Sequence, residues 1–228
     1  MKIIRHLTPT GPAYASLQSD GSAREITGDI YGDFRVTDRV VTPGKLLAPV
    51  VPVFLPCIGL NYKRHAAESN LPPPPYPVLF VKNPASTQNP GDPIEIPVKL
   101  PSTSVDYECE LAVVIGRLCR DVPEERVPEV VLGYTCANDV TARDLQKVDG
   151  QWGRAKGFDT SCPLGPWVET NVDPNETRVW TRLNGDTVQS GETRDMVFGV
   201  ATLIEYLTAF MTLLPGDVLF SWLVRHAA

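Results

Sequence analysis

The chain has 228 residues, a formal net charge of -6 and an isoelectric point near 5.1. This length suits one good-sized domain or a domain with a small appendage, and the acidic balance argues against nucleic acid or an anionic membrane as the main partner. No apolar stretch approaches the roughly 20 residues that a membrane-spanning helix needs.

The first residues, Met1 to His6, lack the apolar core of a secretory signal. The five cysteines are odd in number and form no Cys-x-x-Cys pair, a pattern typical of reduced thiols in an intracellular enzyme. We therefore expect a cytoplasmic location. The absence of acidic residues before Asp20 keeps a mitochondrial address open.

Proline and glycine interrupt short apolar runs along the chain, which favours a sheet-rich α+β protein with few helices. Residues 1–50 alternate strand-like pieces with turn clusters, and we expect a small N-terminal subdomain there, followed by a larger domain over 51–228. Strands are predicted over 53–59, 78–82, 94–96 and 130–136, and helices over 62–69 and 203–210.

Two glutamates stand at the head of the apolar run Leu111 to Gly116, which is predicted to be a buried strand. Side chains two apart on a strand share a face, so Glu108 and Glu110 project together while Cys109 points the other way. Like charges held this close repel unless a hard divalent cation neutralises them. The alternative is the solvated edge of an amphipathic strand.

A third carboxylate follows the predicted strand over 130–136. Asp139 lies at this strand-to-helix corner, where sites often form, and Thr141 with Asp144 resembles a capping box at the start of a helix. Arg143 and Gln146, three positions apart, would then share one face of that helix.

A glycine-flanked loop over 153–159 carries Lys156, a cation that could meet an anionic substrate. Upstream, His65 and Glu68 lie three apart on the predicted helix over 62–69. A carboxylate beside an imidazole raises the basicity of the imidazole, which suits activation of a water molecule. The alternative is a surface pair without a role.

Three carboxylates without a nearby His or Cys favour Mg²⁺, Mn²⁺ or Ca²⁺ over Zn²⁺. The chain has no Gly-x-Gly-x-x-Gly, no P-loop, no Gly-x-Ser-x-Gly and no zinc-type spacing. Nucleotide cofactors and a serine-hydrolase mechanism are therefore poorly supported.

Five ordered motifs resemble the fumarylacetoacetate hydrolase superfamily over about residues 45–220. They are Ile58-Gly59-Leu60-Asn61-Tyr62 with His65 and Glu68, Val78-Leu79-Phe80-Val81-Lys82, Glu108-x-Glu110-Leu111, Asn138 to Asp144 with Gln146, and Lys156-x-Phe158-Asp159-Thr160-x-Cys162-Pro163-Leu164-Gly165-Pro166. The resemblance implies a mixed β-sandwich roll that usually dimerises, so a homodimer is expected.

The resemblance also implies roles for particular residues. Glu108, Glu110 and Asp139 would bind Mg²⁺ or Mn²⁺, and a lid would carry His65 and Glu68 as the dyad that activates water. The side chains that would orient the substrate and stabilise its developing charge are those of Arg143, Gln146 and Lys156.

One departure from the family pattern lies at the end of the sequence. Relatives continue beyond Phe220 with a Thr-Gly-Thr-Pro turn and further strands, whereas this chain runs into Ser221 to Ala228. We expect a C-terminally truncated catalytic domain over 51–228, with an incomplete sheet, apolar side chains exposed near 213–220, and no turn to anchor the substrate carboxylate.

The function that the resemblance implies is metal-dependent hydrolysis of a C–C bond in a 2-oxo or 1,3-dicarbonyl acid, of the acylpyruvate or fumarylacetoacetate type. Decarboxylation or keto–enol tautomerisation of oxaloacetate on the same site is the first alternative. The second, from another class, is a catalytically impaired relative that acts as a binding or dimer partner.

Overall fold

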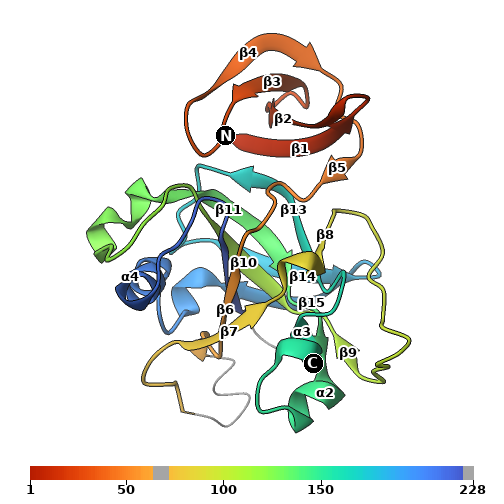
Figure 1. The fold of residues 1–228 in the computed structure, drawn as a ribbon, viewed down its shortest axis with the longest axis vertical. Coiled ribbons are helices and arrows are strands. Elements are labelled where there is room, and N and C mark those ends of the chain that lie inside the picture. The colour runs from red at the N-terminus through yellow and green to blue at the C-terminus, as the bar shows by residue number, and fades with distance from the viewer. Residues whose placement is uncertain (64–71, 223–228) are drawn as a thin grey trace.

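The computed structural model of the protein describes residues 1–63 and 72–222 (Figure 1). Most of the described chain is strand, and its elements in order are β1 (Lys2–Thr8), β2 (Gly11–Leu17), β3 (Ala23–Gly28), β4 (Phe34–Val41), β5 (Leu46–Leu47), β6 (Leu55–Gly59), β7 (Val78–Lys82), η1 (Pro84–Ser86), β8 (Thr87–Gln88), β9 (Val105–Asp106), β10 (Cys109–Ile115), η2 (Glu124–Glu129), β11 (Val131–Asn138), β12 (Thr141–Ala142), α2 (Arg143–Val148), α3 (Gly153–Lys156), β13 (Cys162–Glu169), β14 (Arg178–Leu183), β15 (Asp186–Glu192), η3 (Thr193–Asp195), α4 (Val200–Phe210) and β16 (Val218–Trp222). The expectation of a β-rich mixed fold is confirmed.

One large sheet runs through the described residues in the order β4-β3-β2-β1-β13-β11-β10-β16-β6-β7, with β5 beside β1 and β8 beside β13. The sheet is mixed, because β16 runs parallel to β6 and β8 parallel to β13 while the other neighbours are antiparallel. Strands β1 to β4 lie at one end of the molecule, away from α2 and α3 (Figure 1).

Strand β10 is buried on both faces, which explains its continuous apolar sequence. Leu111 and Val113 pack in the cluster that includes α4, whereas Ala112 and Val114 pack in a second cluster with β13 and β16. Glu110 has the same parity as Ala112 and therefore faces the second cluster. The strand thus carries its one acidic side chain, that of Glu110, on an interior face.

Five of the predicted segments match observed elements within a few residues: β6, β7, β10, β11 and α4. The strand predicted over 94–96 is wrong, since this segment pairs with no strand. Prolines 93 and 97 flank it, and the N–H of Glu95 donates to the Thr160 hydroxyl at 2.7 Å instead of to a neighbouring strand.

The expectation of exposed apolar side chains near residues 213–220 is also wrong for the described residues. Strand β16 lies inside the sheet, antiparallel to β10 and parallel to β6. Leu213, Val218, Leu219 and Phe220 are all buried, and only Leu214 of the apolar residues from 213 to 220 is exposed. The error arose because β6, from far earlier in the chain, covers the side that was expected to be open.

None of the helices in the described parts of the chain is long and apolar enough to cross a membrane. The longest, α4, covers one face of β10 through Val200, Leu203, Ile204 and Leu207. This face of β10 is closed by apolar packing. The acidic residues Glu108 and Glu110 lie instead where β10 begins.

Candidate active site

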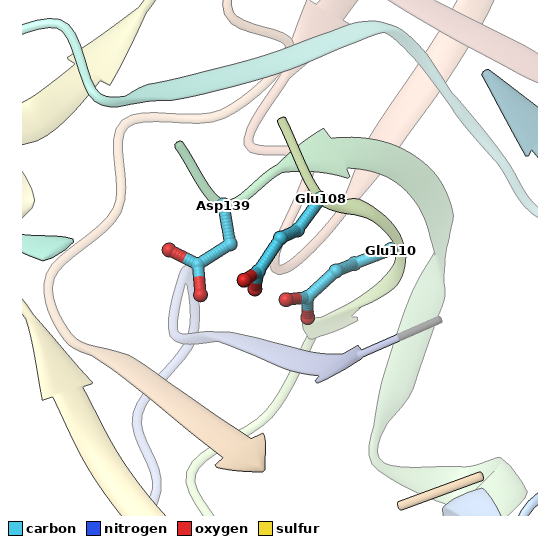
Figure 2. A group of neighbouring side chains, drawn as sticks. All are labelled: Glu108, Glu110 and Asp139. Atoms are coloured by element: carbon cyan, nitrogen blue, oxygen red, sulfur yellow. The ribbon is translucent and has the colours of Figure 1, made fainter. Parts of the chain in front are cut away.

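Three carboxylates meet where β10 begins and β11 ends (Figure 2). The two strands are antiparallel neighbours with Cys109 opposite Asn138, so the residues just outside the ladder are also neighbours. The N–H of Asp139 donates to the carbonyl of Glu108 at 2.9 Å, and the N–H of Glu108 donates to the Asn138 side chain at 2.9 Å. Strand pairing therefore fixes both backbones.

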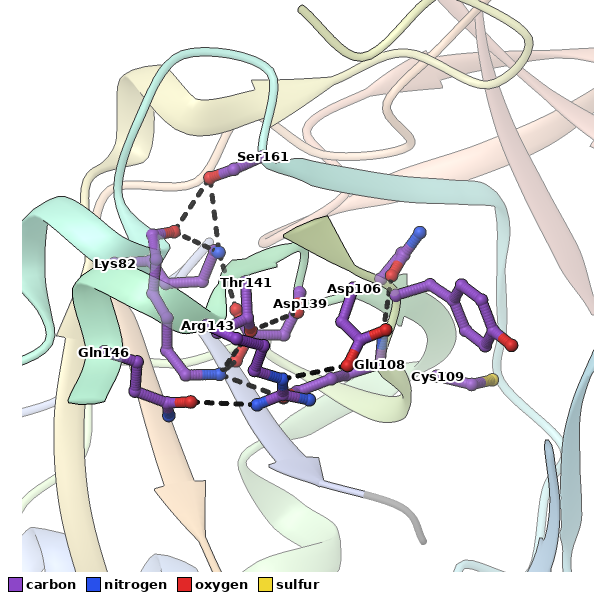
Figure 3. Close-up of polar contacts among 12 residues, drawn as sticks. Lys82, Asp106, Glu108, Cys109, Asp139, Thr141, Arg143, Gln146 and Ser161 are labelled. Atoms are coloured by element: carbon purple, nitrogen blue, oxygen red, sulfur yellow. Dashed lines mark hydrogen bonds and ion pairs between the residues drawn. The ribbon is translucent and has the colours of Figure 1, made fainter. Parts of the chain in front are cut away.

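The ligand oxygens of Glu108, Glu110 and Asp139 lie within 4.8 Å of one another, and all three side chains have 0% exposure. This burial excludes the solvated strand edge that was the alternative for the glutamate pair. Cys109 points away from Glu108 and Asp139 (Figure 3). Its thiol lies 3.5 Å from the Trp180 carbonyl oxygen. The same-face prediction for the glutamates is confirmed.

Lys156 lies among these carboxylates. Its ammonium group donates to Glu108 Oε2 at 2.9 Å, to Thr141 Oγ1 at 2.9 Å and to Asp139 Oδ2. The residue ends the short helix α3, so the expectation of a loop is corrected. The ammonium group of Lys156 is fully buried and is held by protein carboxylates. The glycine-flanked sequence alone did not predict this burial.

Lys82, at the end of β7, is a second buried cation that the sequence did not single out. It donates to Asp139 Oδ1 at 2.6 Å and to Ser161 Oγ at 3.3 Å (Figure 3). The available signal was a lysine that closes an apolar strand, Val78 to Lys82. Each oxygen of the Asp139 carboxylate is therefore paired with a lysine.

Arg143, the first residue of α2, spans three acceptors. Nη2 lies 2.5 Å from Glu108 Oε1, Nε lies 3.0 Å from Asp106 Oδ2, and Nη1 donates to Gln146 Oε1 at 2.9 Å (Figure 3). The prediction that Arg143 and Gln146 share a face is confirmed. Asp106 was missed, although it stands two residues before Glu108 in the sequence.

The capping box predicted at Thr141 and Asp144 is absent. Thr141 precedes the helix and donates to the Asp139 carbonyl at 2.9 Å, while the N-cap position is held by Ala142 without a side-chain hydrogen bond. Asp144 instead accepts from the N–H of Thr103 at 3.0 Å. The two-residue strand β12 occupies the position at which the helix was predicted to start. Helix α2 therefore begins only at Arg143.

Burial and charge set the protonation of the three acids. Burial, together with the negative charges of Asp139 and Glu108, raises the pKa of Glu110 well above its usual range. Burial also raises the pKa of Glu108, although Lys156 opposes this effect. For Asp139 the burial effect is outweighed by Lys156 and Lys82, which hold its pKa below the usual range.

Glu110 is the acid without a hydrogen-bond partner among the residues that the structure describes. Both of its carboxylate oxygens are buried and have no hydrogen bond to any residue that the structure describes. Buried polar atoms are normally paired, and an unpaired group calls for a bound ion or water. An all-oxygen site beside two further carboxylates fits Mg²⁺ or Mn²⁺, which take oxygen ligands and keep several waters.

The predicted dyad of His65 and Glu68 lies outside the described residues. The chain just before it is held firmly at Asn61, whose amide donates to the Phe198 carbonyl at 2.9 Å and to Ser221 Oγ at 2.8 Å. Its Oδ1 accepts from the Phe198 N–H at 2.9 Å. The side chain of Asn61 is therefore fully hydrogen-bonded, two residues before Lys63, the last described residue ahead of the dyad.

Comparison with known proteins places the chain in a family. Residues 55–221 match the fumarylacetoacetate (FAA) hydrolase C-terminal family, and residues 1–49 match the Rv2993c-like N-terminal family. Protein Rv2993c of Mycobacterium tuberculosis is 41% identical over 232 residues, covering 97% of this chain and 87% of that protein. The chain belongs to the fumarylacetoacetate hydrolase family, as the sequence motifs predicted.

Two solved structures share the fold throughout. A 5-carboxymethyl-2-hydroxymuconate delta-isomerase from Mycobacterium smegmatis is 40% identical, with a TM-score of 0.89 over 100% of this chain and 90% of that chain. Fumarylacetoacetate hydrolase from Exiguobacterium antarcticum is 34% identical, with a TM-score of 0.85 over 99% of this chain and 87% of that chain. These neighbours are an isomerase and a hydrolase of one enzyme family.

Proposed function

We propose that the protein is a divalent-metal-dependent enzyme that cleaves a C–C bond in a 2-oxo or 1,3-dicarbonyl acid by hydrolysis. The observation that carries the proposal is the buried Glu110 carboxylate, with both oxygens unpaired among the described residues, beside Glu108 and Asp139. These three residues would hold Mg²⁺ or Mn²⁺. When bound, such a cation stabilises negative charge that develops on substrate oxygens.

The cationic side chains have separate tasks in this proposal. Lys156, held between Glu108 and Asp139, would stabilise charge on the reacting part of the substrate. The planar guanidinium of Arg143, fixed by Asp106 and Gln146, would orient the substrate carboxylate, a task that suits its fork of donors. His65 and Glu68 would activate the attacking water, as their family resemblance suggests.

Isomerisation is the second candidate, and a specific observation favours it. The Mycobacterium smegmatis structure, similar over the full length of this chain, is named as an isomerase. Proton transfer within a dicarbonyl acid needs charge stabilisation from the same carboxylate and lysine cluster but no attack by water. Decarboxylation of oxaloacetate uses the same stabilisation and is the third outcome to be tested.

The deciding experiment assays the protein with Mg²⁺ or Mn²⁺ on acylpyruvates, fumarylacetoacetate-type acids, oxaloacetate and 2-hydroxydienoic acids. Hydrolysis that falls by about 10²- to 10⁴-fold in His65→Ala, with unchanged metal affinity, supports the proposal. Turnover of the dienoic acids alone favours the isomerase, and loss of CO₂ from oxaloacetate favours the decarboxylase. No turnover with metal bound indicates a binding partner without catalysis.

A further inference from the structure

Lys82 is a buried cation that the proposed chemistry does not use. Its side chain has 0% exposure at the end of β7, a strand that is otherwise Val, Leu and Phe. An ammonium group withdrawn from water is costly unless its charge and all its donors are satisfied. Its presence there therefore requires a set of fixed partners.

The three donors of Lys82 have three acceptors. They are Asp139 Oδ1 at 2.6 Å, Ser161 Oγ at 3.3 Å and the main-chain carbonyl of Lys156. Ser161 Oγ itself donates to the same Lys156 carbonyl, at 2.8 Å. The main-chain carbonyl of Lys156 is thus held by the side chains of Lys82 and Ser161. Lys82 also bonds to the carboxylate of Asp139, which the ammonium group of Lys156 contacts.

The backbone after Lys156 is equally confined. Gly157 packs so closely that a Cβ there would lie 2.6 Å from the Gly153 carbonyl oxygen and 3.4 Å from the N atom of Asn83, the residue after Lys82. Helix α3 has four residues and cannot rigidify itself. External contacts must therefore fix the direction in which the Lys156 side chain leaves the main chain.

We propose that Lys82 and Ser161 are positioning residues that clamp the main chain at Lys156 and so deliver its ammonium group between Glu108 and Asp139. Lys82 holds both ends of this arrangement, because it bonds to the Lys156 carbonyl and to the Asp139 carboxylate. Neither residue needs to touch the substrate. The clamp itself follows from the contacts of Lys82 and Ser161 given above. Its effect on catalysis rests on the proposed function.

Ser161→Ala is the primary test, because it removes the hydroxyl without stranding a charge, whereas Lys82→Met leaves Asp139 Oδ1 unpaired and endangers folding. Ser86→Ala is the matched control. Ser86 is also a serine at 0% exposure, and its hydroxyl donates to a main-chain carbonyl, that of Asn83, at 2.6 Å. Both variants lose one buried hydroxyl, but only Ser161 contacts Lys82 and the Lys156 carbonyl.

The first readout is independent of turnover. In ¹⁵N-labelled protein, buried and hydrogen-bonded ammonium groups exchange slowly with water, and Lys82 and Lys156 are the buried lysines among the described residues. We expect their ammonium signals to shift or broaden in Ser161→Ala and to stay in place in Ser86→Ala. Unchanged signals in Ser161→Ala overturn the clamp.

The second readout separates positioning from general stability. In Ser161→Ala, kcat should fall at least about tenfold, while the substrate KM and the Mn²⁺ Kd stay within about twofold, because small misplacement of a catalytic group mainly lowers kcat. Altered signals with an unchanged kcat overturn the positioning role. If the wild-type protein turns over nothing, the proposed function fails, and the ammonium signals still decide whether the clamp exists.

Discussion

The N–H of Asp139 donates to the carbonyl of Glu108 across 2.9 Å, one step beyond the last paired residues of β10 and β11. This single main-chain contact joins the corner aspartate to the glutamate pair. Because side chains alternate along β10, it also brings Glu110 to the same side. A metal site at this position depends on strand register, which the apolar packing of both faces of β10 fixes.

Glu110→Gln tests the metal site most directly. The change keeps the shape of the side chain but removes a negative charge and one anionic ligand. Loss of a supporting contact around a metal typically weakens affinity about 10- to 100-fold, so loss of a ligand should weaken Mn²⁺ binding at least that much. Isothermal titration calorimetry gives the affinity, and Glu205→Gln on the exposed side of α4 is the control. Equal affinity in both variants would remove Glu110 from the site.

Metal binding should release protons and strengthen as pH rises. The pKa of Glu110 is raised in the folded, metal-free protein, first by burial and then by Asp139 and Glu108. At pH values below 4.5, the ordinary carboxyl pKa, the raised pKa of Glu110 contributes its full stabilisation to the metal-free fold. This contribution is lost as the pH rises through the pKa that Glu110 has in the folded protein. A cation that binds the ionised carboxylate offsets that loss.

The difference in melting temperature between metal-loaded and metal-free protein should therefore widen as pH rises above this ordinary value. Calorimetry in two buffers of different ionisation enthalpy counts the protons released. Glu110→Gln should release fewer. A pH-independent difference in the wild-type protein would show that the carboxylates are already ionised before the metal arrives.

Much of the site could be predicted from local sequence. Alternation on a strand placed Glu108 with Glu110, and helical spacing placed Arg143 with Gln146, because these relationships depend only on backbone geometry. Lys82 could not be found this way. Its contact with Asp139 joins β7 to the end of β11, two strands that are not neighbours in the sheet.

Arg143→Lys tests whether shape or charge matters at this position. The guanidinium contacts Glu108, Asp106 and Gln146 through three different nitrogens, whereas an ammonium group is a compact charge on a flexible stem. We expect turnover to fall at least about tenfold despite the conserved charge. Gln146→Ala should cost less, because it removes one neutral acceptor. If Arg143→Lys retained wild-type kcat/KM, positive charge alone would suffice.

The final prediction concerns β16, which the sequence alone suggested would be an exposed edge. Phe220 has 0% exposure and packs with Val114 and Val218 in the cluster between β10, β13 and β16. Phe220→Ala should lower the free energy of unfolding by about 3–5 kcal/mol, the usual cost of emptying a buried phenylalanine site. Phe210→Ala is the control, since Phe210 is 49% exposed at the end of α4. Urea unfolding followed by tryptophan fluorescence measures both. If the two variants lost the same small amount of stability, β16 would not be an internal strand in solution, and the expectation of an open edge near the C-terminus would return.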